Sequence, residues 1–190
     1  MVHTDQRPTI ILLSGYARAG KNTFALGMQD VCDNLIETSI AFSLKEACDE
    51  MVYGLNLNYK RENTFFNEEF KAKHRDFLVA TGRFARSLNK DVFVNELINR
   101  VAYAKSCNVV VTDWRYLNEV NCIREKLTEW RIVTVYIETL GLFAINEEEA
   151  LSIAEIRRAM ACDYEFYFAP NSASAVISTG RNLARELGLG

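Results

Sequence analysis

One short stretch, residues 15–23, constrains the fold more than any other part of the chain; it reads GYARAGKNT. An apolar, β-branched run over 9–13 precedes it, and residues 24–28 continue with the apolar spacing of a helix. The two glycines allow backbone angles that a Cβ would forbid, so the loop can turn its amide N–H groups inward. Inward amides followed by a lysine and a helix N-terminus are typical of a phosphate-binding loop, or P-loop. The residues expected to bind the nucleotide are Gly15, Ala17, Arg18, Ala19, Gly20, Lys21, Asn22 and Thr23.

One position departs from the usual P-loop pattern, in which Ser or Thr follows the lysine and holds Mg²⁺. Here Asn22 follows Lys21, and Thr23 comes next. An amide side chain can still offer its carbonyl oxygen to Mg²⁺ or to the water around the ion. The sequence therefore predicts an ATP and Mg²⁺ site at this loop. The competing interpretation is a glycine-rich turn that only leads into a helix.

Strand and helix patterns alternate along the rest of the chain. This alternation predicts an α/β fold with a mainly parallel sheet. Together with the P-loop, it leads us to expect the three-layer P-loop NTPase architecture, with helices on both faces of the sheet. We expect a single domain over 1–190, an acceptor or lid region around 54–90, and a second candidate lid segment around 140–162. Expected strands are 9–14, 38–42, 109–112, 132–137 and 164–168; expected helices are 21–32, 44–53, 68–81, 91–105, 117–130, 146–160 and 173–187.

Three local signals set helix ends in this prediction. Ser43, with Glu46 three residues later, suggests a capping box at the start of the helix over 44–53. Gly82 is expected to end the helix over 68–81. The polar and aromatic stretch over 56–67 breaks the pattern and is interpreted either as a substrate loop or as a plain surface loop.

In a parallel sheet, ligands gather at the carboxyl ends of the strands. Lys45, Asp113 and Arg115 each follow a predicted strand, so we expect them beside the P-loop. Asp113 is a candidate carboxylate for the water shell of Mg²⁺, or else a turn carboxylate. Arg115 is a candidate phosphate ligand or a surface ion pair. Glu119 is expected either to orient Arg115 or to face water.

Two arginines after Gly82, Arg83 and Arg86, present guanidinium forks that suit phosphate, although a solvated helix end explains them equally well. Arg157 and Arg158 are weaker candidates for a lid that closes over ATP. Catalytic roles are assigned to Lys21, Asp113, Arg115 and Arg86; substrate roles to Lys45, Arg83, Arg86, Arg115 and Glu119; and Mg²⁺ ligation, partly through water, to Asn22, Thr23 and Asp113.

Composition excludes several other classes. The net charge of -3 gives no general attraction to nucleic acid, and no apolar run is long enough to span a membrane. The chain has two histidines, so neither a histidine-based metal site nor Ser-His-Asp chemistry is expected. The odd number of scattered cysteines indicates reduced thiols and a cytoplasmic location. They are Cys32, Cys48, Cys107, Cys122 and Cys162.

Several segments together resemble the phage deoxynucleoside monophosphate kinases. The similarity covers the P-loop over 14–23, the segment AFSLKEA over 41–47, the glycine-to-arginine element over 81–86 with DVFV over 91–94, and VVVTDWRYLNE over 109–119. The resemblance implies a nucleotide-kinase-like fold and transfer of the γ-phosphate of ATP to a deoxynucleoside monophosphate, in the host cytoplasm if a phage encodes the chain. It also explains Asn22, because this family tends to carry Asp or Asn after the lysine.

Two alternatives stay open. The acceptor is either the free nucleotide or 5-hydroxymethyluracil within DNA, the latter through a groove near Lys71, Lys73, Arg75 and Arg83. The chain could instead be a P-loop ATPase or switch without an acceptor. A homodimer is a further open expectation.

Overall fold

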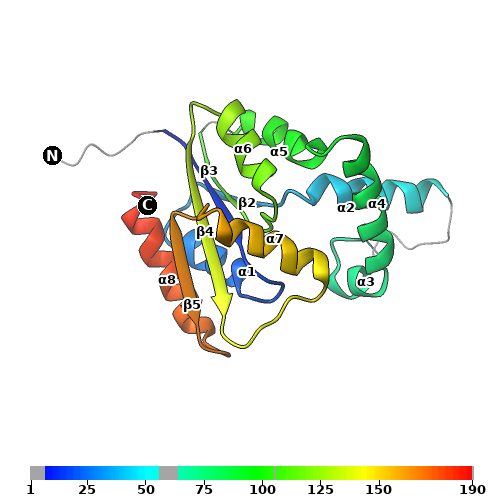
Figure 1. Cartoon of the computed structure of the whole chain (residues 1–190). Coiled ribbons are helices and arrows are strands. Elements are labelled where there is room, and N and C mark those ends of the chain that lie inside the picture. The colour runs from blue at the N-terminus through cyan, green and yellow to red at the C-terminus, as the bar shows by residue number, and fades with distance from the viewer. Residues whose placement is uncertain (1–6, 56–63, 105, 190) are drawn as a thin grey trace.

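A five-stranded sheet runs through the centre of the molecule (Figure 1). The computed structural model describes residues 7–55, 64–104 and 106–189. All recorded strand pairs are parallel, and the strand order is β2-β3-β1-β4-β5. This arrangement confirms the predicted α/β fold with a parallel sheet. The strands are β1 (Thr9–Ser14), β2 (Leu35–Thr38), β3 (Asn108–Val111), β4 (Arg131–Thr139) and β5 (Tyr164–Phe168).

Helices cover both faces of this sheet because its central strand is apolar on both sides. Successive side chains of a strand point to opposite faces, and β1 follows this rule: Ile10 and Leu12 join one core, whereas Ile11 and Leu13 join the other. Buried residues of α1 (Lys21–Gln29) and α8 (Ala173–Glu186) fill the second core. The first core is filled by α5 (Val92–Ala102), α6 (Leu117–Lys126) and α7 (Glu147–Arg158).

An arm of three helices extends from one end of the sheet (Figure 1). It consists of α2 (Phe42–Gly54), α3 (Glu68–Lys73) and α4 (Arg75–Leu88). Phe65 and Phe70 are buried inside this arm with Leu44, and their packing continues the first core. The arm is therefore anchored to the same hydrophobic core that supports the sheet.

The structure corrects the second predicted strand. β2 spans Leu35–Thr38 and ends where the sequence pattern placed its beginning. The physical reason is the carboxylate of Asp113, which accepts hydrogen bonds from the amides of Ile40 and Ala41. These two residues therefore turn into α2 and do not extend the strand ladder. The capping box at Ser43 is also wrong, because α2 begins at Phe42 and Ser43 lies inside its first turn.

Gly82 does not end a helix. It is buried within α4, which continues to Leu88. A Cβ at Gly82 would lie 3.1 Å from Cδ2 of Leu44, so the glycine allows α2 and α4 to pack closely. The helix predicted over 68–81 is instead divided at His74 into α3 and α4.

The other predicted elements begin and end within four residues of the observed ones. The long connection predicted over 56–67 lies largely outside the described residues. All five cysteines are free. Within the described ranges, no helix has the length and apolarity needed to cross a membrane.

Candidate functional site

The P-loop connects β1 to α1 at the carboxyl edge of the sheet, and its backbone requires glycine. Gly15 has φ 141° and Gly20 has φ 94°, angles that residues with a Cβ rarely adopt. A Cβ at Gly15 would lie 2.0 Å from the carbonyl oxygen of Ile137 on β4. Arg18 also has a positive φ, of 67°. The loop is therefore held in one shape by its own torsions and by the neighbouring strand.

Lys21 lies at the mouth of this loop. Its Nζ donates hydrogen bonds to the carbonyl oxygens of Gly15 and Tyr16, both at 2.8 Å. Burial lowers the pKa of Lys21 to about 8, and the nearby Arg115 guanidinium adds to the shift. Glu149 and Asp113 partly offset it. The first turn of α1 has no acidic residue and no side-chain cap, so its amides are available to an anion.

A cavity of about 400 Å³ opens beside the P-loop. Thr23 and Arg18 line one side, and the segments after β4 and β5 line the other. Asn22, in contrast, is exposed to solvent. Sequence reasoning missed the far wall of this cavity, because no motif marks these loops; the topology alone brings them beside the P-loop. That wall is formed by Thr139, Leu140, Gly141, Leu142, Ala169, Pro170, Asn171, Ser172, Ala173 and Val176.

Asp113 follows β3 at the same edge of the sheet and has a structural contact there. Its Oδ1 accepts the amide N–H of Ile40 at 2.6 Å, and its Oδ2 accepts that of Ala41 at 3.0 Å. The carboxylate thus fixes the turn into α2. It also lies near enough to Lys21 to raise the pKa of the ammonium group. Because each carboxylate oxygen accepts more than one hydrogen bond, Asp113 can still take a water of a hydrated cation.

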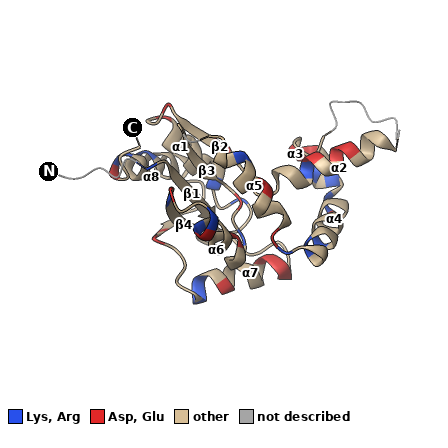
Figure 2. Cartoon of the chain, turned by 90° about the horizontal axis from the view of Figure 1, so that it is seen from above, with Lys and Arg blue, Asp and Glu red and all other residues tan. Residues whose placement is uncertain are grey.

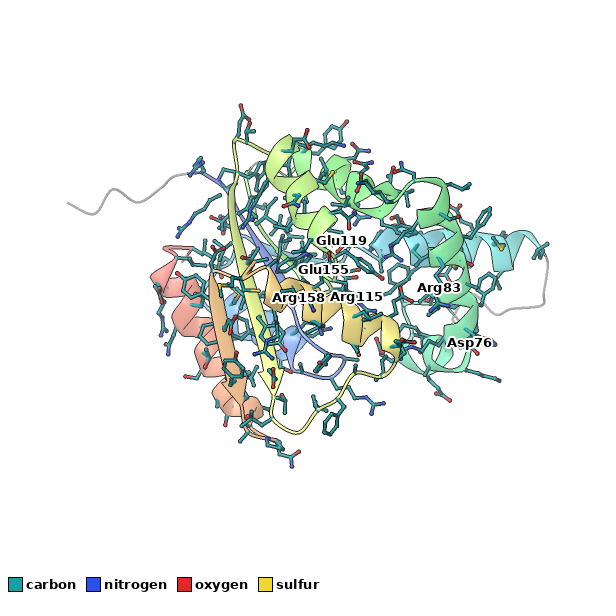
Figure 3. The ribbon with its side chains drawn as sticks, viewed as in Figure 1. Asp76, Arg83, Arg115, Glu119, Glu155 and Arg158 are labelled. Carbon is teal, nitrogen blue, oxygen red and sulfur yellow. The ribbon has the colours of Figure 1, made fainter. Side chains whose placement is uncertain are left out.

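Glu119 neither faces water nor contacts the Arg115 guanidinium in a recorded hydrogen bond. Its side chain is buried, and its Oε2 accepts the amide N–H groups of Arg115 and Tyr116. Burial raises the pKa of Glu119 to about 7, although these two amides oppose the shift. Glu119 therefore orients Arg115 through the main chain, by holding the turn after β3. Figure 3 shows Arg115 and Glu119 near the centre of the molecule.

The two arginines of α4 differ in their surroundings. The Arg86 guanidinium lies between two aromatic rings, 4.9 Å from the Phe93 centroid and 5.0 Å from the Tyr116 centroid. Arg83 is 65% exposed, and its Nε and Nη2 both donate to Oε2 of Glu148 on α7. Glu148 also accepts the hydroxyl of Tyr116 through Oε1. Arg86 also lies near enough to Glu148 to lower the pKa of that carboxyl, so Arg83 and Arg86 belong to one cluster around a carboxylate.

This cluster borders a larger cavity, of about 660 Å³, between α4 and the first part of α7. Arg83, Tyr116, Glu148 and Ser152 are among its lining residues. Lys45 lies apart from it, with its Nζ 5.3 Å from the centroid of the Phe66 ring. Burial, and then Lys71, lower the pKa of Lys45. The structure thus brings Arg83 and Arg86 together, whereas Lys45 lies near the start of α2, close enough to Asp113 for that carboxylate to oppose the lowering of its pKa.

Helix α7 contacts the P-loop with an acidic residue, which the sequence interpretation did not predict. Oε1 of Glu149 accepts the amide N–H of Ala17 at 3.0 Å. The arginines considered for a lid lie at the other end of the helix; Figure 2 shows acidic residues at one end of α7 and basic residues at the other. Arg157 pairs with Glu138 at 3.5 Å and lies over the Tyr136 ring. No hydrogen bond or ion pair recorded for the described part of the chain joins Arg157 to the P-loop.

No protein-family model matches this chain, and no curated protein matches it. Among solved structures, it is similar to the shikimate kinase of Acinetobacter baumannii in complex with shikimate, at 15% identity and a TM-score of 0.43 over 96% of this chain and 92% of that one. It is also similar to a sugar kinase from a Janibacter species, at 10% identity and a TM-score of 0.44 over 96% of both chains. The third is the APS kinase of Mycobacterium tuberculosis in complex with AMPPNP and APS, at 11% identity and a TM-score of 0.41 over 97% and 99%. These similarities are too distant to assign a substrate.

Proposed function

We propose that this protein is an ATP- and Mg²⁺-dependent phosphotransferase that moves the γ-phosphoryl group of ATP to a deoxynucleoside monophosphate. The observation that carries the proposal is the P-loop cradle over 15–23, with the Lys21 ammonium at its mouth and the Arg115 guanidinium close by. Phosphoryl transfer depends mainly on positioning and on stabilising charge. A backbone cradle with two cations supplies both.

The smaller cavity supports a nucleotide as the donor. It continues from Gly20 and Thr23 of the P-loop to the loops after β4 and β5. Its volume of about 400 Å³ lies within the range of small-molecule sites. With the triphosphate on the loop amides, the ribose and base of ATP would extend into this cavity past Thr23.

The residues at this edge of the sheet also fit a hydrated Mg²⁺ ion. Among the described side chains, no group of three acidic, histidine or cysteine residues could hold a metal alone. Mg²⁺ in such enzymes keeps several waters and shares its ligands with the phosphates. The hydroxyls of Ser14 and Ser43 are buried and have no recorded partner, so this region can accept further water or ligand oxygens. Asn22, Thr23 and Asp113 would hold the ion or its waters, and Mg²⁺ would neutralise phosphate charge.

The arginine cluster supports an anionic acceptor. Arg83 and the Tyr116 hydroxyl already surround a carboxylate, that of Glu148. Groups that bind a carboxylate in this way also suit a phosphate monoester, which accepts the same hydrogen bonds. We therefore assign Arg83, Arg86 and Arg115 to the acceptor phosphate or to the charge of the transition state.

The test is a coupled assay of ADP release with MgATP and each of the common deoxynucleoside monophosphates. At least one monophosphate should stimulate turnover, and Lys21→Ala should lower that rate about 10²–10³-fold, because the transition state loses a preorganised cation. Lys90→Ala is the control, since this exposed lysine has no recorded side-chain contact to the site. Turnover that no monophosphate stimulates would refute the proposed acceptor.

Two further arms of the assay separate the alternative acceptors. Lys73 and Arg75 are exposed on the helical arm that carries Arg83, and exposed cations could contact the DNA backbone. DNA that contains 5-hydroxymethyluracil is therefore incubated with radiolabelled ATP. Label in DNA, with none in free nucleotides, would replace the proposed acceptor by DNA. Hydrolysis of ATP without any phosphorylated product would instead favour an ATPase or switch.

A further inference from the structure

The first turn of α7 carries three consecutive glutamates in different surroundings. Glu147 is exposed, Glu148 is half-buried and Glu149 is 3% exposed. Oε1 of Glu149 accepts the Ala17 amide of the P-loop, and its Oε2 accepts the amide of Ile145. A buried carboxylate is costly unless hydrogen bonds satisfy it, and here one of those bonds is made by the P-loop itself.

The hydrogen bond between the Ala17 amide and Glu149 is not needed to cap the N-terminus of α7. Asn146 already caps α7, because its side chain accepts the Glu149 amide at 2.8 Å. The bond from Ile145 to Glu149 holds the chain just before the helix. Ala17, however, is 132 residues away in sequence and belongs to a loop whose amides are predicted to receive phosphate. Glu149 therefore occupies one hydrogen-bond position of an anion cradle with a negative charge from the same chain.

The negative charge of Glu149 opposes binding of a phosphate at the Ala17 amide. Glu149 lies close enough to Lys21 to raise the pKa of that ammonium group, as a bound phosphate would. A polyphosphate placed on the same amides would lie within a few ångströms of the carboxylate, and like charges at that distance repel. The carboxylate and the phosphate cannot share the cradle.

We infer that Glu149 is an internal occupant of the P-loop, which the triphosphate of the donor displaces when it binds. The inference rests on the proposed function, because it requires a polyphosphate ligand at this loop. Binding of the donor then exchanges one anion for another on the Ala17 amide. It also releases the first turn of α7 from the P-loop.

Glu148, the residue before Glu149, connects the release of α7 to the arginines assigned to the acceptor. Glu148 holds the same helical turn to α4 through Arg83 and to the turn after β3 through Tyr116. Figure 3 shows Arg83 on α4 and Arg115 near the middle of the molecule. A shift of this helical turn on donor binding would therefore loosen the carboxylate that the arginine cluster now surrounds. Glu148 and Glu149 act as gating residues and do not contact the reacting atoms.

The first experiment measures the Kd of MgATP by titration calorimetry for the wild type, Glu149→Gln and Glu149→Ala. Removing the competing charge should tighten ATP binding about three- to tenfold, because the free cradle becomes more populated. Glu147→Gln removes the same charge from the same turn without a recorded contact to the P-loop, and should change the Kd less than about twofold. Unchanged or weaker ATP binding in both Glu149 variants would overturn the inference, since a purely structural glutamate would give that result.

The second experiment uses only the wild type, so it does not depend on the stability of a variant. Hydrogen exchange is followed with and without MgATP. Exchange should slow in the peptide that contains residues 15–22 and become faster in the peptide that contains residues 145–150. Protection of both segments, or no change over 145–150, would contradict displacement.

The binding measurement, combined with the coupled assay of ADP release, separates this inference from the proposed function. Wild-type binding of ATP that the Glu149 variants do not tighten refutes displacement and leaves the kinase proposal standing. Tighter binding in the variants, with no monophosphate stimulating turnover, supports displacement and refutes the acceptor. If neither the wild type nor the variants bind ATP, both proposals fail.

Discussion

The P-loop and the arginine cluster of α4 are both candidate anion sites, but they are built from different parts of the chain. The P-loop uses main-chain amides fixed by two positive-φ glycines and by the close approach of β4. The cluster uses long side chains, and its partners come from α4, α7 and the turn after β3. A site made of backbone keeps its shape without a ligand, whereas a site made of side chains depends on what each of them contacts.

The two sites suit different parts of the proposed reaction. Under the proposed function, fixed amides suit the part of the substrates that never varies, the polyphosphate of the donor. Under the same proposal, arginine side chains suit an acceptor that has to enter, react and leave. The carboxylates of Glu148 and Glu149 connect the two sites, because one contacts each of them.

The strongest test of the rigid site is Gly15→Ala. The added Cβ would meet the Ile137 carbonyl oxygen at 2.0 Å and would force a residue with a Cβ to adopt φ 141°. We expect a loss of about 3 kcal/mol in the free energy of unfolding, measured by urea denaturation. Gly54→Ala, at a helical position with open space around it, should be neutral or stabilise the protein by up to about 1 kcal/mol. Equal effects of the two substitutions would show that the P-loop is not rigid.

The pH dependence of stability tests how Glu119 holds the turn after β3, which lies between the two sites. The pKa of Glu119 is raised to about 7, above the ordinary glutamate value of 4.5, so folding disfavours the ionised form. The folded protein therefore binds more protons than the unfolded chain between these values, and stability should fall as the pH rises from about 4.5 to 7. The loss from this group is on the order of 3 kcal/mol, from 1.36 kcal/mol per pKa unit.

The check is urea denaturation across this pH range for the wild type and Glu119→Gln. The variant cannot ionise at this position, so its stability should vary less with pH over the same range. An identical pH dependence in both proteins would mean that Glu119 does not titrate there.

The smallest effects are expected within the arginine cluster. Arg86→Ala removes a guanidinium held between two rings and should cost about 1–2 kcal/mol of stability. Arg83→Ala should change stability by less than about 0.5 kcal/mol, because its ion pair with Glu148 is largely exposed. Both variants should raise the KM of the acceptor more than that of ATP. A selective rise in the KM of ATP would place the cluster on the donor side.

The sequence by itself determined the parallel α/β fold and the position of the P-loop. Both depend on local rules: β-branched runs form buried strands, and the P-loop requires glycine, lysine and a following helix within nine residues. The site residues assigned to this loop are close together in sequence, so their neighbours could be named without a structure.

Only the tertiary structure decided the rest, because the deciding contacts join residues that are far apart in sequence. Gly82 has the signature of a helix end, yet its role is set by Leu44 across the helix interface. Asp113 ends β2 and starts α2 from another strand. Glu149 has the signature of an acidic helix start, and its contact with Ala17 exists because the topology brings α7 over the P-loop. The local sequence pattern indicates which secondary structure a residue favours, whereas tertiary packing determines which distant residue it contacts.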